Sequence, residues 1–192
     1  GAGLPGARIR CVVHRVNIRH HTFMRIFTNP RQASHHPRDE IFRGNRVPCF
    51  ETPSRAMFVE QALRARGHVL HAPDVDSAVV LGKVHAARYL EFLRGAWDQW
   101  LALDSANADE QPFPSAWPVR TLRSDIEPQN FTARLGLYSM DNGSPLCAGT
   151  WAAAKAGADA AASAAQALLK GERSSFCATR PPGHHATRNQ AM

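Results

Sequence analysis

The chain has 192 residues, of which 44% are hydrophobic and 20% charged, a balance typical of a globular domain and not of a disordered segment. This length is enough for a single domain with a buried core, and no apolar run reaches the roughly eighteen residues that a membrane-spanning helix needs. The four cysteines are scattered, without a Cys-x-x-Cys pair. The sequence therefore favours free thiols over a zinc ribbon or a disulfide framework.

The net charge of +7 is concentrated in the first part of the chain. Residues 1–55 carry ten Lys and Arg against three acidic residues, whereas residues 56–192 carry thirteen of each. A nucleic-acid-binding surface combines basic residues with interleaved aromatic residues or a recognisable motif, and neither is present. We therefore expect no nucleic-acid partner and no membrane partner. Since no secretory signal opens the chain, we expect a cytoplasmic protein.

Residues 1–23 differ in composition from the rest. They are rich in Arg and His and contain no acidic residue and no Met. The segment Met-Arg-Ile-Phe at 24–27 predicts the first strand. We expect residues 1–23 to be an upstream extension, a tag or a mis-assigned start, with a functional basic arm as the alternative, and residues 24–192 to form the domain.

The next elements alternate between helix and strand. Residues 54–67 predict a helix that is capped by Ser54 and ended by Gly67. Residues 69–73 predict a short strand or extended segment.

Residues 77–103 predict a second helical region, preceded by the capping carboxylates Asp74 and Asp76 and interrupted near Gly82. We interpret His85 as a histidine that packs and hydrogen-bonds. An apolar stripe repeats at three and four residues and predicts a core-facing surface, with an aromatic ligand box as the less favoured reading. The stripe consists of Tyr89, Leu90, Leu93, Trp97, Trp100 and Leu101.

Two polar segments predict loops. Residues 28–46 contain Pro, Gly and the pair His35-His36, which we expect on the surface. Residues 104–149 are rich in Pro, Gly, Asp and Asn, and a loop of this length in a compact domain is usually functional or disordered.

A long alanine-rich helix follows. Thr150 is placed to cap it, eleven alanines occur within 152–167, and Gly171 is placed to end it. Residues 174–179 predict a buried strand after this helix. Alternation of strand, helix and strand is typical of a parallel α/β sheet with crossover helices.

The segment after this strand contains the chemistry-bearing residues. Thr179-Arg-Pro-Pro-Gly-His-His-Ala186 places two prolines, then Gly183, then His184 and His185 at the carboxyl end of a strand, where ligands bind in open α/β sheets. Imidazole is the side chain best suited to proton transfer near neutral pH. The pairs at 20–21 and 35–36 follow neither a strand-like run nor a glycine.

The motif Arg-Pro-Pro-Gly-His-His-Ala at 180–186 resembles the signature of the zinc-dependent deacetylase family, which includes histone deacetylases and acetylpolyamine amidohydrolases. Further segments are most similar to the bacterial acetylpolyamine amidohydrolase branch, and the resemblance extends over about residues 24–192. These segments are 46–55, 83–93, 96–100, 113–120, 125–127 and 148–151.

The resemblance implies an α/β fold of arginase-deacetylase type, with a parallel sheet and flanking helices, of which this chain would be the N-terminal portion. It implies a homodimer of the complete protein, and it places the loop at 28–46 near the active-site mouth, which is the alternative reading for His35 and His36. His185 resembles the general base and acid of the family, and His184 an electrostatic partner that stabilises the oxyanion. Gly183 corresponds to the tunnel wall, and Arg180 to a residue that holds the strand end.

The resemblance also implies a small cationic acetylated amine as substrate. Glu127 matches a glutamate that faces the substrate, and Asp141 lies near a second acid of the rim, although Gly143 stands at the directly aligned position. Carboxylates there would attract the protonated amines of an acetylated polyamine. Three solvated loop acids, Asp125 included, are the alternative.

The implied cofactor is Zn²⁺, but its ligands are not found. The family binds zinc through an Asp-x-His pair and a later Asp, and no Asp-x-His occurs in this chain, so we expect the ligands downstream of Met192 and no metal ligand among the present residues. The hypothesis is a zinc-dependent deacetylase of acetylated polyamines whose isolated 192-residue chain is inactive. The alternatives are a protein lysine deacetylase of histone type and a truncated, non-catalytic binding module.

Overall fold

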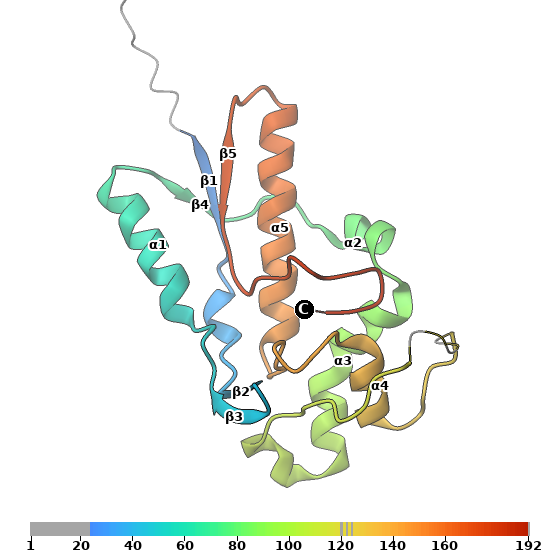
Figure 1. Ribbon diagram of the computed structural model, residues 1–192. Helices are drawn as coiled ribbons and strands as arrows, with labels where there is room; N and C mark the ends of the chain where they lie inside the picture. Colours follow the sequence, from blue (N-terminus) through green and yellow to red (C-terminus); the bar gives the residue numbers. More distant parts are fainter. Residues whose placement is uncertain (1–23, 120, 122, 124, 192) are drawn as a thin grey trace, which may run out of the picture.

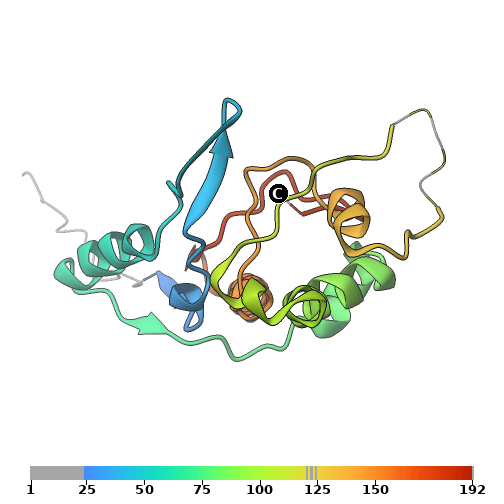
Figure 2. The same ribbon diagram turned by 90° about the horizontal axis from the view of Figure 1, so that it is seen from below.

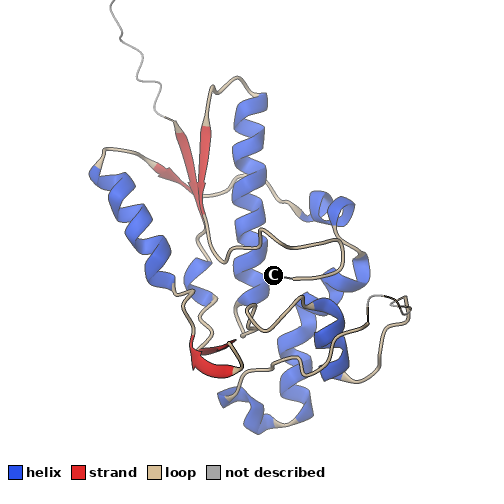
Figure 3. Ribbon diagram, in the orientation of Figure 1, coloured by secondary structure: helices blue, strands red, loops and turns tan. Residues whose placement is uncertain are grey.

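The structure, a computed structural model, describes residues 24–119, 121, 123 and 125–191. The predictions for residues 1–23 lie outside this part of the chain. Three parallel strands form the central sheet in the order β4-β1-β5, and Figure 3 shows them side by side. They are β1 (Arg25–Thr28), β4 (Leu70–His71) and β5 (Ser175–Ala178). The predicted parallel sheet is confirmed.

Helices cover both faces of this sheet, with α5 (Thr150–Leu169) on one face and α1 (Pro53–Ala65) on the other (Figure 1). The buried residues of α5 are mostly alanines spaced three or four apart, which lets the helix lie close to the strands. The side chain of Phe27 in β1 is fully buried against Ala160, Ala164 and Ala167. The predicted alanine-rich helix and the strand after it are thus confirmed, and Gly171 follows the helix with a φ of 105°.

A second apolar core lies between α3 (Ala87–Leu103) and α4 (Phe131–Tyr138). Rings from both helices stack in it, with the Phe92 and Tyr138 centroids 4.8 Å apart. The predicted stripe is confirmed for Tyr89, Leu90, Leu93, Trp97 and Trp100.

The helical region is interrupted close to Gly82, as predicted, although the break follows this residue. Gly82 lies within α2 (Ala78–Val84), and the chain becomes extended at His85 and Ala86 before α3 begins. Tertiary hydrogen bonds explain the position of the break, because the Ala86 amide donates to the Arg188 carbonyl at 2.9 Å and cannot also bond within a helix. Ser77 occupies the cap position of α2. Of the two predicted capping carboxylates, Asp76 contributes from one residue earlier, since its Oδ1 accepts the Ala78 amide at 2.9 Å, whereas Asp74 pairs with Arg25.

Two helix caps differ from prediction by one or two residues. Thr52, not Ser54, is the cap of α1, because Pro53 has a fixed φ suited to the first helical position. Gly149 caps α5, and Thr150 is its first residue, although the Thr150 hydroxyl accepts the Cys147 amide at 2.8 Å.

The two predicted loops contain regular structure. Residues 28–46 include a short 3₁₀ helix, η1 (Gln32–Ser34), and most of a hairpin of β2 (Asp39–Phe42) and β3 (Asn45–Pro48), which projects from the rest of the molecule in Figure 2. Arg43 and Gly44 form its two-residue turn with φ values of 51° and 79°. Residues 104–149 contain η2 (Ser105–Asp109) as well as α4.

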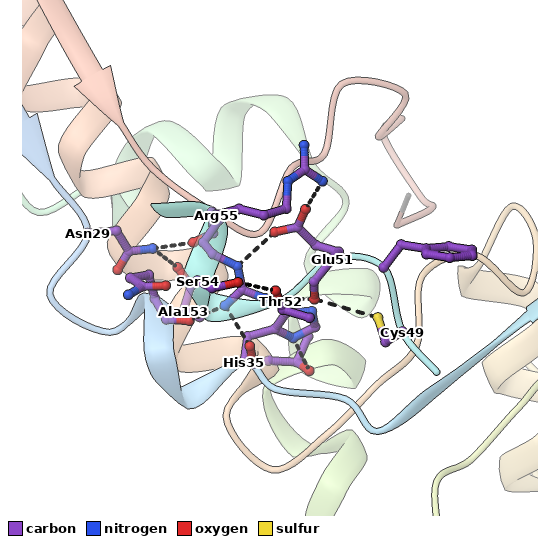
Figure 4. A network of polar contacts seen from close by, with 12 residues as sticks. Asn29, His35, Cys49, Glu51, Thr52, Ser54, Arg55 and Ala153 are labelled. Atoms are coloured by element: carbon purple, nitrogen blue, oxygen red, sulfur yellow. Dashed lines mark hydrogen bonds and ion pairs between the residues drawn. The ribbon is translucent and has the colours of Figure 1, made fainter. Parts of the chain in front are cut away.

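A buried arginine joins three distant segments at the carboxyl end of the sheet. Arg180 is 3% exposed, and its Nε donates to Glu51 Oε1 at 2.7 Å. Nη1 donates to the carbonyls of His35, at 2.6 Å, and Gln32. Figure 4 shows this network around Glu51. The prediction that Arg180 holds the strand end is consistent with these contacts, because its side chain bonds to η1 and to the segment before α1.

Asn29 secures the backbone at the same place. This buried residue follows β1, and its Nδ2 donates to the Ala153 carbonyl at 2.8 Å and to the Arg180 carbonyl at 2.6 Å. Its Oδ1 accepts the Arg31 amide at 2.9 Å. One side chain thereby connects the ends of β1 and β5 to the first turn of α5.

The two histidines at 35–36 differ in environment. His36 is exposed, as expected, but His35 is buried and its Nδ1 lies 3.0 Å from the Thr150 hydroxyl, so the prediction of a surface residue is wrong for His35. Burial, together with the positive charges of Arg180 and His36, lowers the pKa of His35 from 6.5 to about 4. The imidazole is therefore neutral at pH 7 in the folded chain.

Two helical glycines test the close packing of the fold. A Cβ on Gly136 in α4 would lie 1.7 Å from the Ala116 carbonyl oxygen, whereas a Cβ on Gly82 in α2 would meet nothing within 4 Å. We expect Gly136→Ala to lower the free energy of unfolding by roughly 1–3 kcal/mol through steric strain. Gly82→Ala should raise it by roughly 0.5–1 kcal/mol, because alanine favours the helix. Urea unfolding followed by circular dichroism measures both, and equal effects would contradict the packing described.

His35 should make stability depend on pH. Since its pKa is lower in the folded than in the unfolded state, its contribution is complete above pH 6.5 and is lost as the pH falls toward 4. We expect about 3 kcal/mol of stability to be lost through this residue over that range. Urea unfolding of wild type and His35→Asn at pH 7 and pH 4.5 measures it. The variant should lose less stability than wild type, and parallel losses would show that His35 does not take up the proton.

Candidate functional site

The predicted histidine pair occupies an exposed turn beyond the carboxyl end of β5. The Ala186 amide donates to the Gly183 carbonyl at 3.0 Å, which places His184 and His185 at the centre of the turn. Both side chains are exposed, and their ring centroids are 3.8 Å apart with 47° between the planes. The two imidazoles can therefore reach a bound molecule.

The downstream end of this turn is held by His85, which lies between α2 and α3, and by Tyr138 at the end of α4. His85 Nδ1 donates to the Thr187 carbonyl at 2.8 Å, and the His85 ring packs on Tyr89 with centroids 5.4 Å apart. The Ala191 amide donates to the Tyr138 carbonyl at 2.8 Å. The interpretation of His85 as a packing and hydrogen-bonding residue is confirmed.

A cavity of about 510 Å³ lies beside the turn. Gly183 and the two prolines before it form one wall, and apolar residues of α3, α4 and α5 form much of the rest. Most of the exposed surface of the cavity is apolar, and its polar lining residues include His35, Ser144 and Lys155. A mostly apolar cavity of this size with a few polar groups is typical of small-molecule sites. Gly183 thus lies on the cavity wall. His184 and His185 directly follow Gly183 in the chain but are not among the residues that line the cavity.

The structure does not bring the two predicted rim acids onto this wall. Glu127 is partly buried, and its Oε1 lies 3.8 Å from Arg134 Nη1. Asp141 Oδ1 accepts the Gly143 amide at 2.7 Å, so this carboxylate orders its own turn, and it is Gly143 that lines the cavity. Asp125 is exposed and paired with Arg123. The substrate contacts of Glu127 and Asp141 remain predictions.

Tyr138 is a cavity residue that the sequence did not single out. Its ring is buried at the end of α4, and its hydroxyl has no hydrogen-bond partner among the described residues. Burial raises the pKa of Tyr138, and the Glu127 carboxylate raises it further. Burial likewise raises the pKa of Tyr89 to about 12. Both phenols are therefore neutral at pH 7 and able to donate a hydrogen bond. In the sequence, the two tyrosines are spaced like apolar core residues. This spacing indicates a position in the core but no role in the cavity.

The residues that the structure describes do not fit a zinc site. In the described part of the chain, no three His, Cys, Asp or Glu side chains come together in a group that could hold a metal ion. Burial raises the pKa of Cys49 to about 11 and also raises that of Cys177, which disfavours the thiolate form that binds metals. Ligands located downstream of Met192 remain a prediction. None of the described helices is long and apolar enough to cross a membrane.

Comparison with known proteins agrees with this architecture. Residues 49–192 match the sequence model described as histone deacetylase domain. Acetylpolyamine amidohydrolase 2 of Pseudomonas aeruginosa is 42% identical over 153 residues, 79% of this chain and 43% of that protein. Acetylpolyamine amidohydrolase of Mycoplana ramosa is 32% identical over 164 residues, 85% of this chain and 47% of that protein.

The fold matches a solved structure of the same group. The crystal structure of acetylpolyamine aminohydrolase from Burkholderia pseudomallei superposes with a TM-score of 0.77 at 29% identity, covering 88% of this chain and 48% of that one. The parallel sheet with flanking helices is therefore an arginase-deacetylase fold, as expected. The chain spans about half the length of the relatives that it matches. Because the family match extends over most of the sequence, this chain belongs to the histone deacetylase domain family.

Proposed function

We propose that the protein hydrolyses the acetamide bond of acetylated polyamines or similar cationic acetylated amines. The observation that supports this most directly is the exposed His184-His185 turn next to a mostly apolar cavity at the carboxyl end of the sheet. The similarity to proteins named acetylpolyamine amidohydrolases points to the same class of substrate.

In this proposal the histidine pair moves protons. His185 takes a proton from the attacking water and later gives one to the leaving amine, as general base and then general acid. His184, with its ring centroid 3.8 Å away, stabilises the negative charge that develops on the carbonyl oxygen. When bound, the zinc ion that the family implies would activate water and polarise the carbonyl. The described residues do not hold it, so we assign only the proton-transfer steps to them.

The proposed substrate contacts combine the apolar walls of the cavity with two acids that the family resemblance implies. The apolar walls suit the methylene chain of a polyamine, and Gly183 leaves room beside them. Glu127 is the proposed contact for a protonated amine and Asp141 the second, both outside the lining of the cavity. In a homodimer, which remains a proposal, the projecting hairpin would offer the exposed Phe42, which packs edge-on against Phe50 at 5.8 Å.

A second candidate is deacetylation of lysine in proteins. The observation that favours it is the match to the histone deacetylase domain, whose name indicates a protein substrate. A non-catalytic binding module is the third candidate, favoured by the lack of a metal-binding group among the described residues. Comparing which acetylated compounds the protein binds and which it hydrolyses distinguishes the three candidate functions.

Replacement of His185 should remove the activity. We expect the full-length gene product to release acetate from acetylated putrescine, and His185→Ala to lower kcat by about 10²–10⁴-fold, the usual contribution of general acid–base catalysis. His68→Ala is the matched control, because His68 lies before the amino end of β4, away from the turn. Acetate release is measured by a coupled assay with added zinc. Wild-type protein that binds acetylated amines without releasing acetate would favour the binding module.

Replacement of Glu127 should affect cationic substrates selectively. We expect Glu127→Gln to raise KM for acetylated putrescine by roughly three- to tenfold, which corresponds to about 1 kcal/mol of lost attraction. KM for a neutral acetylated amine of the same length should be unchanged. Glu110→Gln, which removes an exposed carboxylate paired with Arg38 and Arg46, is the control. Equal KM changes for both substrates would exclude an electrostatic role of Glu127.

A further inference from the structure

The upstream end of the histidine turn is secured by a side chain that is itself held in place. Arg180 precedes Gly183 by three residues, and its guanidinium is almost completely removed from water. Nε and Nη2 both bond to Glu51, at 2.7 Å to Oε1 and 3.2 Å to the backbone carbonyl. Nη1 bonds to the carbonyls of Gln32 and His35. The orientation of Arg180 therefore depends mainly on one residue from another part of the chain, Glu51.

Glu51 supplies the charge in this arrangement. The other groups that Arg180 bonds are neutral carbonyls, and in the described part of the chain the Glu51 carboxylate is the one acidic group paired with it. Loss of one partner from a buried ion pair leaves an uncompensated charge, which the protein can relieve by letting that charge move toward water. For Arg180, such a movement would displace the backbone that leads into the turn.

Both oxygens of the Glu51 carboxylate are already occupied. Oε1 accepts from Arg180, and Oε2 accepts from Arg55 Nη1. Although Glu51 is among the residues that line the cavity, its carboxylate is thus committed to two arginines and is not available as a first contact for an amine. Its place in the site is to hold other groups in position.

We propose that Glu51 is a positioning residue, which acts through Arg180 to fix the His184-His185 turn relative to the cavity. This inference rests on the proposed deacetylase function. The turn is secured from one side by Glu51 and Arg180 and from the other by the bond between His85 and the Thr187 carbonyl. Displacement of catalytic groups by about 1 Å can cost on the order of 100-fold in rate, so a defect in this anchor affects kcat more than KM.

Three variants test the proposal. Glu51→Ala removes the anchor. Glu51→Asp keeps a carboxylate charge opposite Arg180 and serves as the conservative rescue. Glu110→Gln is the matched control, because Glu110 also pairs with arginines but lies on the exposed surface. Imidazole proton resonances of His184 and His185 report on the turn in this chain, with His68 as an internal reference, and kcat and KM for acetylated putrescine are measured on the full-length gene product.

The expected result is a change confined to the turn. In Glu51→Ala, the resonances of His184 and His185 should shift or broaden while those of His68 stay, and kcat should fall by about 10- to 100-fold with KM within about twofold. Glu51→Asp should recover much of both effects, because it restores the charge opposite Arg180, and Glu110→Gln should resemble wild type.

Other outcomes overturn the proposal or separate it from the proposed function. Unchanged histidine resonances together with unchanged kcat in Glu51→Ala would exclude positioning. Equal changes at His68 would show that Glu51 supports the fold as a whole and not the turn. If the turn resonances move but His185→Ala hydrolyses as fast as wild type, the positioning contact exists and the assigned catalytic role of the pair is wrong.

Discussion

The buried charge of Arg180 is the constraint on which the arrangement of the site depends. A guanidinium removed from water needs an opposite charge and acceptors for its N–H groups. These come from two other places in the chain: the carbonyls of Gln32 and His35 in and just after η1, and Glu51 ahead of α1. The segments that contribute them must converge on the end of β5. The conformation of the loop between β1 and α1 is therefore coupled to the position of the histidine turn.

The alanine-rich helix α5 joins this polar centre to the apolar parts of the molecule. One of its faces packs on β1 through Ala160 and Ala164, and its first turn accepts the Asn29 side chain through the Ala153 carbonyl. Other residues of the same helix line the cavity. The histidines are thus exposed on a turn whose two ends are attached to rigid elements, an arrangement that lets side chains meet a ligand without loss of precise placement.

Much of this organisation follows from sequence patterns, and the exceptions have physical reasons. Apolar periodicity and helix-ending glycines located α1, α3, α5 and β5, and the proline-glycine-histidine motif located the turn. The hairpin of β2 and β3 was missed because half of its strand residues are polar and none of them is buried. The helix α4 was missed because it has only eight residues, inside a Pro- and Gly-rich region. The burial of His35 results from contacts with Thr150 and Arg180, more than a hundred positions away, which no local pattern encodes.

The separation of these partners along the chain also bears on how the molecule folds. Each residue of β1 pairs with a residue of β5 150 positions later, and Asn29 bonds to Arg180 across 151 positions. Closing such long loops costs chain conformational entropy before the native contacts that offset this cost can form. Folding is therefore slow compared with helical bundles of similar size. The sheet and the histidine turn should therefore form in the same late step, after α1, α3 and α5 have begun to form from local interactions.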